Sequence, residues 1–279
     1  MTFLSRVWTT LAECKSPADY YRLHLSIQQF ATPDEVALIA RSSTALPPEF
    51  DRELRVLASR MTEIRDDIQI CRFTQIAENI SLYVGTTPGR RLVFAFGGKG
   101  VGLFMPTALV LQYLVPEGCD VVILHDPARI GFVSGIFGYS DSFRGLVERL
   151  RADIDFGGYE SVRVYGISGG GAAALAAGVL LGTPSASCFS GHMPMSSPKR
   201  AERPQARVMD ALLRDAAPLS TFSCVFGADS AYDVNHAAGM ETALRTRQIS
   251  IPGVSNHNVV WELHKQKKLL TVFRDVGLI

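Results

Sequence analysis

A serine flanked by glycines is the residue of this sequence best placed to act as a nucleophile. Residues 166–170 read GISGG, which has the form G-x-S-x-G with Ser168 at its centre. An apolar run rich in β-branched residues, 161–165, precedes the motif, and an alanine-rich run, 171–181, follows it. A strand, a sharp turn at the serine and a helix are the context in which this motif forms a nucleophile elbow. The pattern therefore predicts covalent acyl transfer through Ser168.

A second glycine-rich segment offers backbone N–H groups to a developing oxyanion. Residues 96–100 read FGGKG and directly follow a continuous apolar run. Such N–H groups, together with that of Gly169, could hold the negative oxygen of a tetrahedral intermediate. We predict Gly98 as the second donor, with Lys99 as the alternative, and Gly97 as a candidate for substrate binding.

Two other chemistries fit the sequence less well. A phosphate-binding P-loop requires G-x-x-x-x-G-K-[ST], whereas Lys99 is followed by a glycine and the leading glycine is missing; an ordinary tight turn is the other alternative for this loop. The five cysteines are scattered and form no C-x-x-C pair, and none has the glycine-rich setting of Ser168. They indicate reduced thiols of a cytoplasmic protein, with no metal site.

An acid and a base follow the serine in the order that a catalytic triad needs. Asp229 comes directly after a predicted strand, and Asp233, four residues later, is the alternative acid. His257 lies in the segment SNHN, between the last predicted strand and the last predicted helix. Because catalytic groups gather at the carboxyl ends of parallel strands, we expect Asp229 to orient His257, and His257 to activate Ser168.

This arrangement resembles the α/β-hydrolase superfamily over about residues 68–279. The resemblance rests on GISGG, on FGGKG, on GAD after a strand and on SNHN near the end. The segment 125–132, HDPARIGF, is also similar to the D-x-R-G-x-G segment common after the fourth strand, with Ile130 in place of the first glycine. The resemblance implies the roles of nucleophile, base, acid and two oxyanion donors for Ser168, His257, Asp229, Gly98 and Gly169.

Alternating strands and helices must position these groups. Continuous apolar runs predict strands buried on both faces, and alternating runs predict half-exposed edge strands. The alternation predicts an α/β protein with a mainly parallel central sheet and helices on both faces. We expect strands at 68–73, 80–84, 92–96, 121–124, 161–165, 186–189, 222–226 and 247–251. We expect helices at 103–115, 141–153, 169–182, 205–216, 235–245 and 258–273.

The N-terminal residues 1–65 differ from the rest, because they read as helices and contain no glycine. Thr32 followed by Pro-Asp-Glu predicts a capping box at one helix start. We interpret this part as a helical extension that covers part of the core, with docking of a protein partner or a second copy as the alternative. Residues 66–279 would form the catalytic domain, with a short lid at about 194–218.

Size and charge limit the partners of the chain. Its 279 residues are 47% hydrophobic and carry a net charge of +1, so no strong attraction to nucleic acid is expected. There is no run of about 18 apolar residues, so we expect no membrane span. The N-terminus lacks a basic region followed by a long apolar core, so a secretory signal is not expected and we predict a cytoplasmic protein.

The sequence thus predicts a serine hydrolase that cleaves an ester of a small or polar substrate without a cofactor. His125, His192 and Phe132 are further candidates for substrate binding, Phe132 as part of an acyl-side wall, with ordinary loop packing as the alternative for Phe132. An acyltransferase, thioesterase or peptidase with the same triad is the alternative, because sequence alone does not separate water from another acceptor. A non-enzymatic scaffold that binds a partner through the N-terminal helices is the second alternative.

Overall fold

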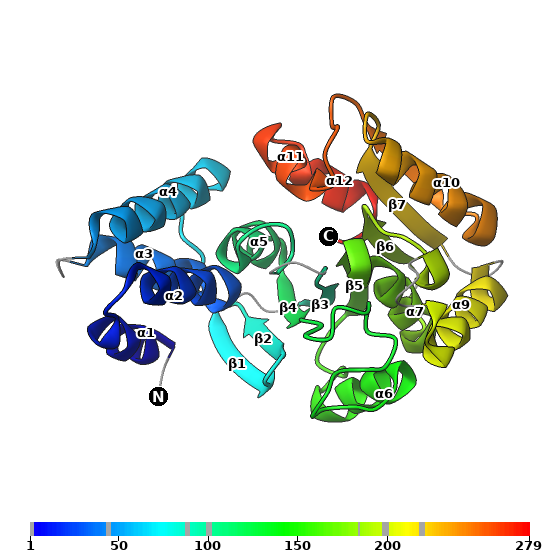
Figure 1. Ribbon diagram of the computed structural model, residues 1–279, viewed down its shortest axis with the longest axis horizontal. Coiled ribbons are helices and arrows are strands. Elements are labelled where there is room, and N and C mark those ends of the chain that lie inside the picture. Colours follow the sequence, from blue (N-terminus) through cyan, green and yellow to red (C-terminus); the bar gives the residue numbers. More distant parts are fainter. Residues whose placement is uncertain are drawn as a thin grey trace.

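An eight-stranded sheet in the order β1-β2-β4-β3-β5-β6-β7-β8 forms the centre of the molecule (Figure 1). The computed structural model describes residues 3–42, 46–86, 90–98, 102–183, 185–196, 201–217 and 221–279. β1 and β2 are antiparallel to their neighbours, and the remaining strands are parallel. The strands are β1 (Arg72–Ala77), β2 (Ile80–Val84), β3 (Arg91–Phe96), β4 (Cys119–Leu124), β5 (Ser161–Ile167), β6 (Ser185–Phe189), β7 (Thr221–Gly227) and β8 (Arg247–Ile251). The predicted mainly parallel α/β sheet is confirmed.

The first strand begins later than the predicted 68–73. The backbone N–H of Gln69 donates to the side chain of Gln112, at 3.1 Å, and that of Cys71 donates to Asp34, at 3.4 Å. Pairing with β2 starts only at Arg72. Side chains of the neighbouring helices therefore satisfy the backbone groups that the alternating pattern had assigned to a strand partner.

Helices cover both faces of the sheet. Because successive strand residues point to opposite faces, neighbours such as Val93 and Phe94 belong to two different apolar clusters. One face packs against α5 (Thr107–Leu114), α11 (Val259–Lys265) and α12 (Leu269–Asp275). The other packs against α6 (Phe143–Asp153), α7 (Gly171–Leu181), α9 (Pro204–Ala216) and α10 (Ala231–Leu244). Short 3-10 turns are η1 (Val115–Glu117), η2 (Ser168–Gly170) and η3 (Pro194–Ser196).

Two of the predicted helical segments differ in detail. The predicted helix 258–273 is divided into α11 and α12, because Lys267 has a left-handed φ of 57° that an α-helix cannot accommodate. In the predicted lid, α9 buries Ala206, Met209 and Leu213 against the cluster that contains α7. The helical part of that segment is thus a crossover helix in the layer that covers the sheet. Residues 197–200 and 218 of it lie outside the described residues.

Four helices of the described chain precede the sheet; α2, α3 and α4 pack against α5, and α1 packs against α2 (Figure 1). Ser16 and Thr32 both form capping boxes: each side chain accepts the N–H three residues later, and the acid there accepts the N–H of the cap. Leu54 and Met61 of the fourth helix are buried in the same cluster as α5. The separation of residues 1–65 as an extension stays a prediction. The helices are α1 (Phe3–Glu13), α2 (Pro17–Phe30), α3 (Pro33–Arg41) and α4 (Pro48–Ile64).

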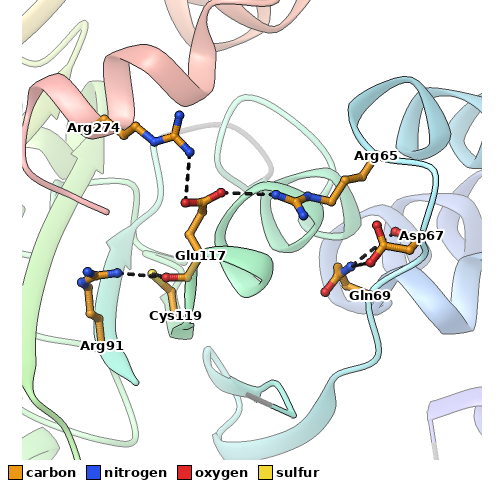
Figure 2. A network of polar contacts seen from close by, with 7 residues as sticks. All are labelled: Arg65, Asp67, Gln69, Arg91, Glu117, Cys119 and Arg274. Carbon is orange, nitrogen blue, oxygen red and sulfur yellow. Dashed lines mark hydrogen bonds and ion pairs between the residues drawn. The ribbon is translucent and has the colours of Figure 1, made fainter. Parts of the chain in front are cut away.

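A network of polar contacts joins the end of this helical part to the C-terminal helix (Figure 2). The carboxylate of Glu117 accepts from Arg65, just after α4, at 3.3 Å and from Arg274 of α12 at 3.2 Å. The guanidinium of Arg91 donates to the backbone carbonyl of Glu117 at 2.9 Å. One glutamate therefore links three segments that are far apart in the sequence. Within the described residues, no helix has the length and apolarity to cross a membrane.

Candidate active site

Ser168 lies in a sharp turn between β5 and α7. Its φ is 49°, in the left-handed region that non-glycine residues rarely adopt. A Cβ on Gly166 would collide with the carbonyl oxygen of Gly170, and a Cβ on Gly170 would collide with that of Gly97. The glycines on either side of the serine are thus required by the close approach of β5, the turn and the loop after β3. The elbow geometry places the hydroxyl at the carboxyl end of the sheet, in a residue that is 8% exposed.

His257 connects Ser168 to an acid. Its Nε2 lies 2.8 Å from the Oγ of Ser168, and its Nδ1 lies 2.6 Å from Oδ1 of Asp233. The Asp233 side chain is only 1% exposed, whereas that of His257 is 35% exposed. A buried carboxylate needs hydrogen-bond donors in place of water, so the imidazole is held in one orientation. In this orientation Nδ1–H donates to Asp233, and Nε2 is free to accept a proton from the serine.

The prediction that Asp229 is the acid that orients His257 is therefore corrected: the carboxylate that contacts His257 is that of Asp233. Asp229 is exposed, and its backbone N–H donates to the carbonyl of Val254 at 3.0 Å. Asp233 lies in the first turn of α10, where its N–H donates to the capping side chain of Ser230 at 3.3 Å. The acid nearest to the strand end forms the turn itself, and the next one, a helical turn later, reaches His257.

Ser190 is a residue that the sequence reasoning missed. It follows β6, is 2% exposed and donates from its Oγ to Oδ2 of Asp233 at 3.3 Å. With His257 on Oδ1, both oxygens of the Asp233 carboxylate have a partner. A serine after a short strand carries no motif, so only the position of β6 beside β7 reveals this contact.

The glycine loop after β3 lies against the serine. A Cβ on Gly98 would stand 3.2 Å from that of Ser168, so the Gly98 backbone passes directly beside the hydroxyl-bearing carbon. The N–H of Gly97 donates to the carbonyl of Leu124 at 2.9 Å, which removes it from ligand binding. Lys99, the alternative oxyanion donor, lies outside the described residues.

Two aromatic rings contact the imidazole of His257, and the sequence pattern predicts neither contact. Phe104, in the segment before α5, contacts it edge-on with ring centroids 5.3 Å apart. Tyr232, next to Asp233 on α10, does so at 5.5 Å. Beyond Tyr232 the row of rings continues to His236 at 4.4 Å and then to His192 at 5.2 Å. The predicted substrate-binding residue His192 is thus connected to the base through a chain of ring contacts.

The two remaining candidates lie deeper. His125 is buried behind Gly97, with its ring 5.9 Å from that of Phe30 of α2. Burial lowers the pKa of His125 to about 4, so it is neutral at pH 7. The prediction for Phe132 is wrong: its side chain is fully buried and packs on Phe96 at 5.2 Å in the core. In the part of the chain that the structure describes, no group of three or more His, Cys, Asp or Glu residues is arranged to hold a metal.

Comparison with known proteins identifies the architecture. No protein-family model and no curated protein matches the sequence. The structure is similar to that of a predicted CIB-like hydrolase from Thermoplasma acidophilum, with a TM-score of 0.51 and 12% identity over 75% of this chain and 98% of that chain. It is also similar to an esterase from the bacterial hormone-sensitive lipase family, with a TM-score of 0.50 and 14% identity over 95% of this chain and 97% of that chain. At such low identity these likenesses concern the fold.

Proposed function

We propose that this chain, which has the α/β-hydrolase fold, hydrolyses esters through an acyl-serine formed on Ser168. The observation that carries the proposal is the unbroken chain of hydrogen bonds from Ser168 through His257 to buried Asp233. In the first step His257 Nε2 takes the proton of the serine hydroxyl while Oγ attacks the ester carbonyl. His257 then gives this proton to the departing alkoxide, which leaves as the alcohol.

Backbone N–H groups would stabilise the oxyanion of each tetrahedral intermediate. Gly169 follows the nucleophile in the turn that leads into α7, and the Gly98 backbone passes beside Ser168. Loss of one such donor typically raises the barrier by about 3–4 kcal/mol. The crowded glycines of the elbow therefore have a catalytic consequence, because they let two backbone segments approach one oxygen.

Water completes the second step in the same geometry. His257 removes a proton from the water, which attacks the acyl-serine, and then returns that proton to Ser168 as the carboxylic acid departs. Asp233 stabilises the imidazolium that forms in both steps. Its two partners, His257 and Ser190, keep the carboxylate fixed while this charge appears and disappears.

The surroundings of the base support a small or polar ester as substrate. The row of ring contacts that begins at His257 and runs through Tyr232 and His236 to His192 consists of side chains that carry ring nitrogens and a phenol hydroxyl. Such groups suit hydroxyl or carbonyl oxygens better than a long acyl chain. We expect p-nitrophenyl acetate to be cleaved with a higher kcat/KM than p-nitrophenyl octanoate; the opposite order would contradict this substrate class.

A serine-reactive fluorophosphonate tests the nucleophile directly. We expect wild-type protein to be labelled on the peptide that contains Ser168, and the variant Ser168→Ala to remain unlabelled. Ser187→Ala, which removes a buried hydroxyl from β6, is the matched control and should label like the wild type. Absence of labelling in a folded wild-type protein would refute the proposed mechanism.

A further inference from the structure

The residue after His257 makes more contacts than a helix cap needs. The side-chain oxygen of Asn258 accepts from the N–H of Trp261 at 3.0 Å, which caps α11. Its side-chain N–H donates to the backbone carbonyl of Phe104 at 2.9 Å. The cap requires only an acceptor, which Ser or Asp would supply equally well. The second bond, to a segment 154 residues away, is what requires the amide.

Phe104 is held in an unusual conformation at the other end of this bond. Its φ is 64°, and it is neither a glycine nor an asparagine, the residues that tolerate the left-handed region best. The side chains of its neighbours Leu103 and Met105 are buried in the core beside α5. Non-glycine residues in this region persist only where surrounding contacts fix them, and they concentrate at functional sites.

The same conformation directs the Phe104 ring to the base. The ring meets the His257 imidazole at an interplanar angle of 81°, and Tyr232 meets the imidazole at 83° from α10. Edge-to-face contacts of this kind favour a defined ring orientation. The two aromatic contacts supplement the hydrogen bond to Asp233, which fixes only one edge of the imidazole.

Phe104 also belongs to the connection that carries Gly98. The connection between β3 and α5 contains Gly98, beside Ser168, and Phe104, against His257. The bond from Asn258 therefore joins the segment that carries the base to the part of this connection that lies next to α5.

We propose that Asn258 is a positioning residue, whose bond to the Phe104 carbonyl holds the Phe104 segment against His257 and so keeps Nε2 directed at Ser168. This inference rests on the proposed function, because it assigns Asn258 a part in the orientation of the general base. The positioning role differs from the capping role in the atom that it requires. Positioning depends on the side-chain N–H of Asn258, which donates to Phe104, whereas capping depends on its side-chain oxygen, which accepts from Trp261.

Two variants separate these roles. Asn258→Ser keeps an acceptor for the Trp261 N–H but is too short to donate to Phe104. Asn258→Ala loses both bonds. We expect both variants to lower kcat for p-nitrophenyl acetate and the rate of fluorophosphonate labelling by about tenfold or more at similar KM, because sub-ångström misplacement of a base is costly. Asn258→Ala should lower Tm more than Asn258→Ser does, because it loses the cap as well as the bond to Phe104.

A readout that does not need turnover tests the same inference. In a proton NMR spectrum, the hydrogen-bonded Nδ1–H of His257 should give a far-downfield signal that is absent in His257→Gln. We expect this signal to broaden through faster exchange in Asn258→Ser and to remain sharp in Ser187→Ala. A wild-type protein that is not labelled, combined with the NMR change, would refute the proposed function and leave the positioning role standing. Asn258→Ser with an unchanged signal would overturn the positioning role, whether or not the wild type is active.

Discussion

Two polar networks join distant parts of this chain, and they differ in burial. In the first, Asp233 holds His257, which reaches Ser168 at the carboxyl end of the sheet. In the second, Glu117 pairs with Arg65 and Arg274 at the opposite, amino end of β4 (Figure 2). The carboxylate side chain is 1% exposed in the first network and 20% exposed in the second, where its arginine partners are 40% and 56% exposed.

The difference in burial gives the two networks different roles. The buried network orients a side chain, and the exposed one attaches one part of the chain to another. Exposed ion pairs contribute a median of about 0–1 kcal/mol, because water and salt screen them and long side chains lose freedom. A buried carboxylate, in contrast, must keep its donors, since an unpaired buried charge is strongly unfavourable. Asp233 therefore fixes the direction of His257, whereas Glu117 adds only modest stability to the contact between the N-terminal helices and α12.

The largest effect is expected from a change in the buried network. Asp233→Asn keeps the size of the side chain but allows the imidazole to take the wrong tautomer, so kcat should fall by about 10⁴. Esterase turnover with p-nitrophenyl acetate measures this loss. Asp229→Asn is the matched control and should change kcat less than threefold, by roughly the amount expected for a surface carboxylate. A large loss in Asp229→Asn alone would reverse the assignment of the acid.

His125 is another buried polar group, and burial alone shifts its pKa. Its effect on stability therefore depends on pH. Burial holds the pKa of His125 at about 4, whereas an unfolded chain has a histidine pKa near 6.5. Above pH 6.5 both states are neutral and His125 contributes no pH dependence. As the pH falls below 6.5 the unfolded state binds the proton first, so stability is lost progressively down to about pH 4, by about 3 kcal/mol.

The variant His125→Gln tests this dependence. It should reduce the loss of unfolding free energy between pH 7 and pH 4 by about 3 kcal/mol relative to wild type. Urea unfolding at both pH values measures the difference. Burial also lowers the pKa values of His24 and His264, but their contributions cancel when the two proteins are compared. Identical pH dependence in the two proteins would contradict the buried, neutral state of His125.

A smaller effect is expected at the glycine loop. A methyl group in Gly98→Ala would stand 3.2 Å from the Ser168 Cβ, so one of the two segments must shift by a few tenths of an ångström. We expect kcat to fall by roughly tenfold, with little change in Tm. Gly158→Ala, where the added Cβ has open space, is the control and should leave kcat unchanged. Equal kcat in both variants would show that Gly98 does not need to approach the serine closely.

The smallest effect should come from the exposed network. Glu117→Gln is expected to lower the free energy of unfolding by no more than about 1 kcal/mol, and by less in 1 M NaCl. Its kcat should equal that of the wild type, because Glu117 lies at the opposite end of β4 from the site. A stability loss as large as that from breaking a buried pair, about 3–5 kcal/mol, would remove the distinction between the two networks.

The sequence pattern predicted correctly those structural elements that depend only on residues close together in the chain. The run before GISGG, the motif and the alanine-rich run after it predict strand, turn and helix, which are β5, the Ser168 turn and α7. The alternation of apolar runs predicted the mainly parallel sheet for the same reason. The strand at 68–73 was misplaced because its N–H groups bond to Gln112 and Asp34, which come from other elements.

The sequence by itself determined the two-sided α/β architecture and identified Ser168 and His257 as candidates, because periodicity and glycine spacing act over a few residues. Only the tertiary structure decided between Asp229 and Asp233, placed Phe132 in the core and brought Ser190, Phe104 and Asn258 to the site. Those outcomes depend on which side chains from separate strands and loops meet in space. These contacts follow from the pitch of α10, the order of the strands and the packing of helices on both faces of the sheet. A local sequence pattern contains none of this information.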